Sequence, residues 1–190
     1  DDKLIRVRNP LGLDPEGMLL ASIIAKKAAV NATHVLIEIP VGKNSKIEDK
    51  QKAIRLKNKF IQLGKKFNIK VIIMFSDGNQ PVGNGIGPSL EARDVLKVLQ
   101  GTGPEDLREK GLKTAAILLK LLNVKDAYTK ATEILDSGLA YEKFREIVKA
   151  QKGNPNLNVE NIKIGPFKYD VKSKSNGIIT KIDNNIISGI

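Results

Sequence analysis

The sequence predicts an α/β protein with a parallel or mixed sheet, flanking helices, a helical segment and the start of a β-rich C-terminal domain. Two short apolar runs rich in β-branched residues, at 34–41 and 69–75, have the pattern of buried strands. A basic amphipathic segment between them, at 47–67, has the spacing of a helix. Strands joined through a helix form a βαβ unit, whose strands pair in parallel. Gly64, inside the helical pattern, is a candidate end for that helix.

A helix is also predicted before the first strand. Residues 15–27 are apolar almost all round, which is typical of a buried helix. Asp14 is suited to the N-cap and Pro15 to the first helical position. Ser22 and Lys26 are four residues apart, so they lie on one side of this helix, one turn from each other. A hydroxyl and an ammonium on such a helix are costly unless polar groups meet them.

A Gly-rich loop at 76–88 follows the second strand and precedes a helix predicted at 89–99. In open parallel sheets, ligands bind beyond the carboxyl ends of the strands, so this loop lies where ligands bind. The spacing within Gly83–Gly87 matches neither the dinucleotide-binding pattern nor the P-loop. The loop therefore predicts a close approach of backbone to a ligand or to a neighbouring segment, with a purely structural turn as the alternative.

The second half of the chain is predicted to be mostly helical. Helices are expected within 105–150, with a break at Ser137 and Gly138. Alternating residues at 167–171 and 178–182 predict two strands joined by a hairpin turn. Both chain ends are expected to be cut from a longer protein. The expected division is part of a small helical lobe at 1–32, an α/β domain with a helical extension at 33–153, and the start of a truncated α+β domain at 154–190.

The composition limits the chemistry. Cys is absent and His34 is the single histidine, so thiolate chemistry and a zinc site are not expected. No apolar run is long enough to span a membrane, and a cytoplasmic location is expected. A net charge of +11 favours anionic ligands such as nucleotides, phosphate or nucleic acid. Aromatic residues make up only 4%, which disfavours a stacking reader of single strands.

Several motifs, in order, resemble the thymidine phosphorylase family of nucleoside phosphorylases. The segment 21–27, ASIIAKK, matches the base-binding helix of that family. The segments QPVG at 80–83 and GPSLEAR at 87–93 match its Gly-rich loop and the next helix. AQKG at 150–153 matches the run before its C-terminal domain. The resemblance therefore extends over nearly the whole chain.

Within this family, the chain is most similar to the archaeal AMP phosphorylases. These carry an acidic residue in a D-P pair eight positions before the helix serine, as Asp14 stands before Ser22. They also carry a V-G-x-x-x-K-I-E-D segment, which matches 41–49 and contains Lys46. The resemblance implies phosphorolysis of AMP to adenine and ribose 1,5-bisphosphate, with CMP and UMP as other substrates. Thymidine or pyrimidine nucleoside phosphorylase is the alternative within the family, and a basic nucleic-acid-binding module is the alternative outside it.

One part of the family pattern has no counterpart here. The phosphate-binding Gly-rich loop of the family lies upstream of the matched region, so the chain is expected to be inactive alone. Inorganic phosphate is the expected co-substrate, and no cofactor is expected. The expected partners are a nucleoside monophosphate and phosphate, with a homo-oligomer as the assembly. Neither a membrane nor a nucleic acid is an expected partner, since Lys and Arg are spread along the sequence.

The resemblance assigns a role to each group of the first helix. Asp14 is the expected acid for the departing base, where negative charge develops as the glycosidic bond breaks. An N-cap Asp, however, is stabilised as the anion, so a plain cap is the alternative. Ser22 is expected to bind the base edge, or else to bond back to its own helix. Lys26 is expected to bind the base, or else to extend along the helix surface into water.

Two further cations are expected near the substrate. Lys46 follows a strand end and is suited to the 5′-phosphate that distinguishes a nucleotide from a nucleoside, with a solvated loop lysine as the alternative. Arg8, or Arg6 in its place, lies near the base-contacting arginine of the family. His34 is expected at a strand edge and outside the site.

Overall fold

Two parallel strands, β1 (His34–Val41) and β2 (Lys70–Asp77), form the sheet of this protein. The computed structural model describes residues 3, 6–7, 9–12, 15–43, 45–187 and 189. The strands pair in register from His34 opposite Lys70 to Val41 opposite Asp77. The βαβ unit predicted from the sequence is therefore confirmed, with β1 at its predicted bounds.

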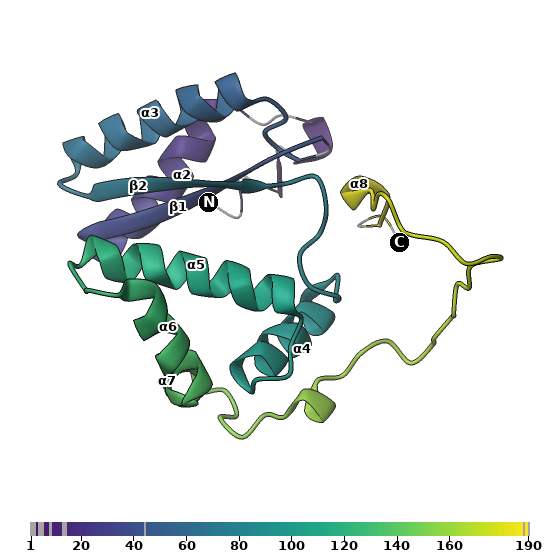
Figure 1. Ribbon diagram of the computed structural model, residues 1–190. Coiled ribbons are helices and arrows are strands. Elements are labelled where there is room, and N and C mark those ends of the chain that lie inside the picture. Colours follow the sequence, from purple (N-terminus) through teal and green to yellow (C-terminus); the bar gives the residue numbers. More distant parts are fainter. Residues whose placement is uncertain are drawn as a thin grey trace. The chain divides into compact units, whose positions relative to one another are not determined.

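Two helices, α2 (Glu16–Ala29) and α3 (Lys50–Lys66), pack with the strands. Burial alternates along β1, so that every second side chain enters the core, as expected for a strand with one covered face. Figure 1 shows α3 lying across the strand pair. Buried core side chains from α2, β1 and α3 include Ile24, Val35, Ile37, Ile39, Leu56 and Phe60. A short 3-10 turn, η1 (Asn9–Leu11), precedes these elements.

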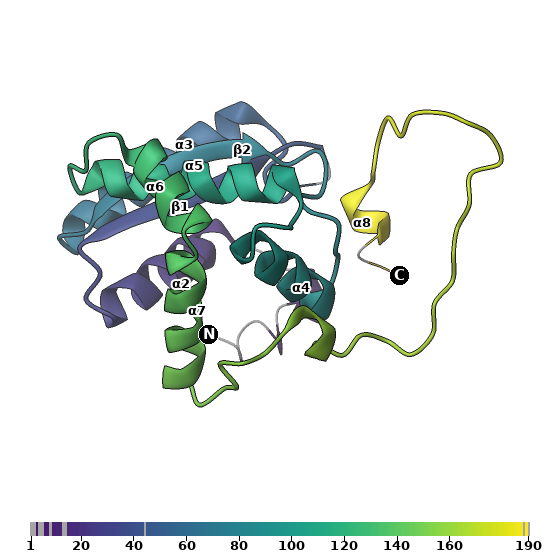
Figure 2. The same cartoon turned by 60° about the horizontal axis from the view of Figure 1, so that its bottom comes forward.

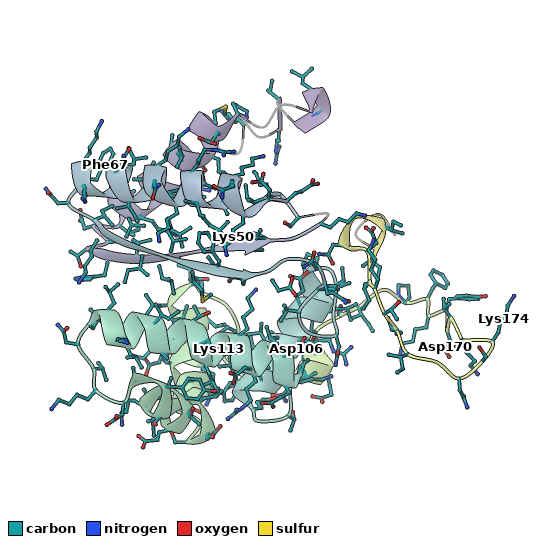
Figure 3. The ribbon with its side chains drawn as sticks, turned by 45° about the horizontal axis from the view of Figure 1, so that its top comes forward. Lys50, Phe67, Asp106, Lys113, Asp170 and Lys174 are labelled. Atoms are coloured by element: carbon teal, nitrogen blue, oxygen red, sulfur yellow. The ribbon has the colours of Figure 1, made fainter. Side chains whose placement is uncertain are left out.

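Helix α3 is defined by its two ends. Asp49 is the N-cap residue, and its side chain accepts a hydrogen bond from the backbone N–H of Lys52 at 2.7 Å. Figure 3 labels Lys50 at the first residue and Phe67 just after the last. Gly64 does not end the helix: a Cβ there would lie 2.4 Å from Cγ2 of Val71. The glycine therefore allows α3 to approach β2 closely, and the candidate end at this position is wrong.

The chain divides into two compact units, residues 1–78 and 79–190. The second unit contains four longer helices, where helices were predicted, and two short turns of helix. The break between the last two long helices falls at Gly138, which has a φ of 81°. The elements are α4 (Pro88–Leu99), α5 (Glu105–Leu121), α6 (Ala127–Asp136), α7 (Leu139–Ala150), η2 (Val159–Asn161) and α8 (Asn184–Ile187).

Two polar contacts join α5 to α6. Arg108 donates from Nη2 to Oδ1 of Asp136 at 2.7 Å, and this hydrogen bond raises the pKa of Arg108. The hydroxyl of Tyr128 donates to Oε2 of Glu109 at 2.6 Å. The same bond lowers the pKa of Glu109 and raises that of Tyr128. Both contacts are exposed, so they orient the helix pair more than they stabilise it.

The two strands predicted at 167–171 and 178–182 are wrong for this structure. Both segments lack regular secondary structure, and Figure 2 shows the chain between η2 and α8 running without strands. Their large apolar side chains are exposed, with Phe167 at 94% and Ile178 at 91%. A two-stranded hairpin is marginal in water without a further strand or a packing surface. The alternating pattern was present, but nothing in the described residues covers its apolar face.

The first helix also differs from the prediction. It begins at Glu16, so the N-cap residue is Pro15. Only Ile24 of α2 is fully buried. The small residues Gly17, Ala21 and Ala25 lie on an exposed side of the helix. The predicted burial on all sides is therefore wrong for this structure. The predicted domain boundaries at 32 and 153 stay predictions.

Within the described residues, no helix has the length and apolar character needed to cross a membrane.

Candidate functional site

The loop that carries Lys46 is a tight turn closed by backbone hydrogen bonds. Gly42 N–H donates to the carbonyl of Ile47 at 3.1 Å, and Ser45 N–H donates to the carbonyl of Gly42 at 3.1 Å. The hydroxyl of Ser45 lies 2.8 Å from the carbonyl oxygen of Gly42 and 2.7 Å from that of Ile47. A hydroxyl has one hydrogen to donate, so it bonds one of these two oxygens at a time. Ser45 therefore holds the two ends of the turn together beside Lys46.

Gly78, which directly follows β2, packs against this turn. Gly78 is buried, and its N–H donates to the carbonyl of Val41 at 2.9 Å. A Cβ at Gly78 would lie 3.0 Å from Cβ of Ser45 and 3.2 Å from Cβ of Pro40. Only a residue without a side chain leaves the turn undisturbed at this separation.

Lys46 and α2 meet at one cavity. The cavity has a volume of about 180 Å³ and lies within the first unit. Leu19 and Ile23 of α2 line it, together with Ser45, Lys46 and residues of β1 and α3. Lys46 itself is exposed, and it interacts with other groups of the protein. The structure therefore brings the sequence-predicted Lys46 to the same small space as the predicted base-binding helix.

Ser22 and Lys26 lie on α2, the helix that contributes Leu19 and Ile23 to this cavity. Leu19, Ile23 and Lys26 follow the i, i+4, i+7 repeat of one helix face, and Ser22 is three residues from Leu19. Ser22 is half-buried and Lys26 is exposed, and each interacts with other groups of the protein. Neither residue lines the cavity, so base binding by Ser22 and Lys26 stays a prediction.

Two predicted site residues cannot be placed. Asp14 and Arg8 lie outside the described residues, so their roles stay predictions. Arg6, the alternative to Arg8, is exposed. His34 is the first residue of β1, which agrees with its expected place at a strand edge, and its Nδ1 lies 3.0 Å from Oγ1 of Thr33.

The Gly-rich loop of the second unit is held by carboxylates of the protein itself. Oδ2 of the buried Asp94 accepts from Asn84 N–H at 2.7 Å and from Gly85 N–H at 2.6 Å. Oδ2 of Asp106 accepts from Gly83 N–H at 3.0 Å. These donors would otherwise attract an anionic ligand. Since they are already satisfied, the structural turn is the interpretation that the geometry favours.

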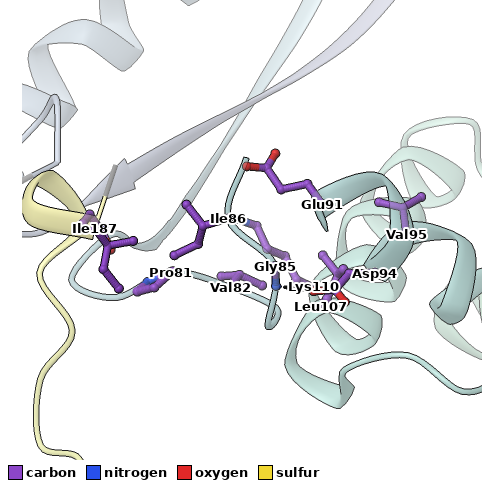
Figure 4. A pocket seen from close by; sticks show the side chains of 11 residues that line it. Pro81, Val82, Gly85, Ile86, Glu91, Asp94, Val95, Leu107, Lys110 and Ile187 are labelled. Carbon is purple, nitrogen blue, oxygen red and sulfur yellow. Dashed lines mark hydrogen bonds between the residues drawn. The ribbon is translucent and has the colours of Figure 1, made fainter. Parts of the chain in front are cut away.

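A cavity of about 430 Å³ lies beside this loop, within the second unit (Figure 4). Pro81, Val82 and Gly85 of the loop line it, with Glu91 and Lys110 as charged neighbours. Gly87 begins α4 with a φ of 97°, and its N–H donates to Oε1 of Glu91 at 3.0 Å. The charges of both signs give this cavity no preference for an anion.

Several polar residues of these regions were missed by the sequence analysis. Ser45 and Asp94 act on backbone groups that only the folded loop brings near them, so no motif marks them. Ser76 at the end of β2 donates to Glu38 of β1, a contact set by strand pairing. The one available signal for Asp94 was its place in the helix that directly follows a run of glycines. Among the residues that the structure describes, no group of three or more His, Asp or Glu could hold a metal ion.

We next compared the sequence of this chain with those of known proteins. No family model matches the chain. AMP phosphorylase 1 of Archaeoglobus fulgidus is 43% identical over 189 residues, which cover 98% of this chain and 38% of that protein. AMP phosphorylase of Pyrococcus horikoshii is 44% identical over 194 residues, or 100% of this chain and 39% of that protein. The resemblance to the AMP phosphorylases is confirmed.

The comparison also includes proteins named for a nucleoside. A putative thymidine phosphorylase of Ralstonia nicotianae is 45% identical over 195 residues, covering 100% of this chain and 38% of that protein. The chain thus spans about two fifths of the length of the curated relatives it matches. Identity to the two kinds of phosphorylase differs by only one or two percentage points, so overall identity does not separate a nucleotide substrate from a nucleoside.

Proposed function

We propose that this chain supplies the base-binding and 5′-phosphate-binding parts of an AMP phosphorylase. The observation that carries the proposal is the shared cavity of Lys46 and α2, since it joins a cation to the helix that matches the base-binding segment. Similarity over the whole chain to proteins named AMP phosphorylase supports it. Phosphate is the proposed co-substrate, no further cofactor is proposed, and CMP and UMP are proposed as other substrates.

In the proposed reaction, phosphate attacks the anomeric carbon of AMP and the bond to adenine breaks. Asp14 gives a proton to the departing base, which leaves adenine and ribose 1,5-bisphosphate. Ser22 and Lys26 bind the base, and Lys46 binds the 5′-phosphate as a point charge.

The test is phosphorolysis by the full-length protein, with AMP, adenosine and thymidine compared as substrates. Lys46→Ala should raise KM for AMP about 10- to 100-fold, the cost of a lost charged hydrogen bond, and leave adenosine unaffected. Lys43→Ala removes an exposed lysine from the same loop and is the matched control. Asp14→Asn should lower kcat about 100- to 10,000-fold. Equal turnover of AMP and adenosine by the unaltered protein would overturn the nucleotide assignment.

Thymidine phosphorylase is the second candidate, because a protein of that name is 45% identical to this chain. It predicts turnover of thymidine that exceeds turnover of AMP, with no effect of Lys46→Ala. The same assay therefore separates the two candidates.

A further inference from the structure

The outer side of α3 has an unusual distribution of charge. The helix carries seven cations and not one carboxylate in its 17 residues. Six of the seven are exposed, and Lys57 is half-buried. Four of the exposed cations, Lys52, Arg55, Lys59 and Lys66, fall on one helix face, because the intervals of three, four and seven residues match the helical repeat. The seven cations are Lys50, Lys52, Arg55, Lys57, Lys59, Lys65 and Lys66.

These cations are almost without acidic partners. Within the described residues, only Lys59 of α3 has an ion pair, and its partner is Glu16 of α2. The helices of the second unit differ, since each of the four longer ones carries acidic residues as well as basic ones, and several of their lysines pair with nearby acids. Lys113 lies 3.0 Å from Glu109 and Lys130 lies 3.2 Å from Glu133. The uncompensated charge is therefore a property of α3 and not of the whole protein.

The arrangement also works against the stability of α3. Lys50 and Lys52 occupy the first turn, where the helix dipole favours acids, and no acidic residue lies in that turn. Lys52 and Arg55 at i, i+3, and Arg55 and Lys59 at i, i+4, repel each other. In contrast, α4, α5 and α7 each have an acid in the first turn. Basic residues that reduce the stability of their own helix indicate that their charge serves to bind a partner.

We propose that this stripe, defined as Lys52, Arg55, Lys59 and Lys66, binds the phosphate backbone of a double-stranded nucleic acid. At 1.5 Å per residue the stripe is about 21 Å long, and a duplex presents one charge per about 1.7 Å of its axis. Although the basic residues are spread along the sequence, the helical repeat gathers these four on one face. Figure 3 shows α3 with its side chains along this length.

The chemistry of the stripe favours a duplex over other polyanions. None of its four residues is aromatic, Phe60 of α3 is buried, and the single exposed Phe67 at the end of the helix gives no row of rings on which successive single-stranded bases could stack. An acidic protein partner would need an apolar anchor at the centre of its interface, and the stripe has none. A membrane-surface helix inserts its apolar face, but the apolar face of α3 is used by the core. Lysine and arginine contacts to phosphate alone give binding that is independent of base sequence.

The experiment measures binding of the full-length protein to a labelled duplex of about 20 base pairs at salt concentrations from about 50 to 200 mM. Since Lys59 is paired with Glu16, three phosphate contacts from Lys52, Arg55 and Lys66 predict a slope of log K against log salt of about −2.7. The triple variant Lys52→Gln, Arg55→Gln, Lys66→Gln should weaken binding about 500-fold at 0.1 M salt, since each lost contact removes about 0.9 log unit. Its turnover of AMP should equal that of the unaltered protein, and its melting temperature should be equal or higher, because like-charge repulsion within α3 is reduced.

The matched control removes three lysines that have acidic partners: Lys113→Gln, Lys130→Gln and Lys143→Gln. This variant has the same net charge as the first and should bind the duplex within about twofold of the unaltered protein if the stripe is the site. An equal loss in both variants would mean attraction by net charge alone and would overturn the proposal. Absence of binding at low salt, or tighter binding of polyglutamate than of the duplex, would also overturn it.

Discussion

Gly78 at the end of β2 lies against Ser45 so closely that a Cβ on Gly78 would be 3.0 Å from Cβ of Ser45. Ser45 in turn holds the two ends of the turn that presents Lys46. The conformation of the proposed phosphate-binding loop therefore depends on a residue that is distant in sequence.

Gly78→Ala is predicted to displace this turn. The added methyl group meets Ser45 and Pro40, so we expect a loss of about 1 to 3 kcal/mol in the free energy of unfolding, as for other overpacked sites. The turn should shift with it and raise KM for AMP. Chemical denaturation measures the first effect and steady-state kinetics the second.

The matched control for this variant is Gly17→Ala. A Cβ at Gly17 would meet nothing within 4 Å, and the residue lies in a helix. Alanine there should stabilise the protein by up to about 1 kcal/mol. Similar destabilisation by both variants would show that close packing at Gly78 is not the cause.

Ser45→Ala is predicted to loosen the turn without removing a group that binds substrate. The carbonyls of Gly42 and Ile47 lose their hydroxyl partner, so Lys46 should be held less firmly. We expect KM for AMP to rise several-fold, KM for adenosine to stay constant and kcat to change little. Ser45→Thr keeps the hydroxyl and should restore the KM for AMP. A loss of both substrates in parallel would point to a general folding defect instead.

Asp94→Ala is predicted to unfold the Gly-rich loop and to destabilise the second unit. The carboxylate is 6% exposed, and its Oδ2 accepts two backbone hydrogen bonds. Removing it leaves two donors without their partner, at about 1 to 3 kcal/mol each if they stay buried. Hydrogen exchange at Asn84 and Gly85 should accelerate. Asp94→Asn keeps an acceptor oxygen and should lose less, while Asp170→Ala, in an exposed segment, should change neither measurement.

The sequence was most informative where structure depends on neighbouring residues. The bounds of β1 and the position of α3 follow from their apolar periodicity, since each has one face on a single core. The prediction for Gly64 was wrong because the role of this glycine depends on its close contact with Val71, which lies on another element. The strands predicted at 167–171 and 178–182 failed for a related reason: alternation specifies a strand only if a partner covers its apolar face.

In the candidate site, too, contacts between residues distant in sequence could not be predicted. Lys46 could be proposed from the spacing of a motif, and the structure then brought it to a cavity shared with α2. Ser45, Gly78 and Asp94 could not be proposed, because each acts on backbone that becomes its neighbour only after folding. Residues that contact a ligand directly leave a pattern in the sequence more readily than residues that position them.

The pair Glu109 and Tyr128 is predicted to stabilise the α5–α6 contact over a limited range of pH. Hydrogen bonds from Tyr128 and then from Lys113 lower the pKa of Glu109 below its unfolded value. The carboxylate therefore contributes to stability above about pH 4.3, and this contribution is lost as pH falls through the lower folded pKa. The hydrogen bond to Glu109 raises the pKa of Tyr128, so its contribution is present below about pH 10 and is lost as pH rises through the higher folded pKa.

Tyr128→Phe tests this range. The difference in melting temperature between the unaltered protein and the variant should be largest near neutral pH and should shrink at both extremes, because the hydrogen bond needs a neutral phenol and an ionised carboxylate. Thermal denaturation across pH measures it. Tyr141→Phe, on α7, is the matched control and should show a difference that does not vary with pH. A constant difference for Tyr128→Phe as well would mean that the tyrosine acts through packing alone.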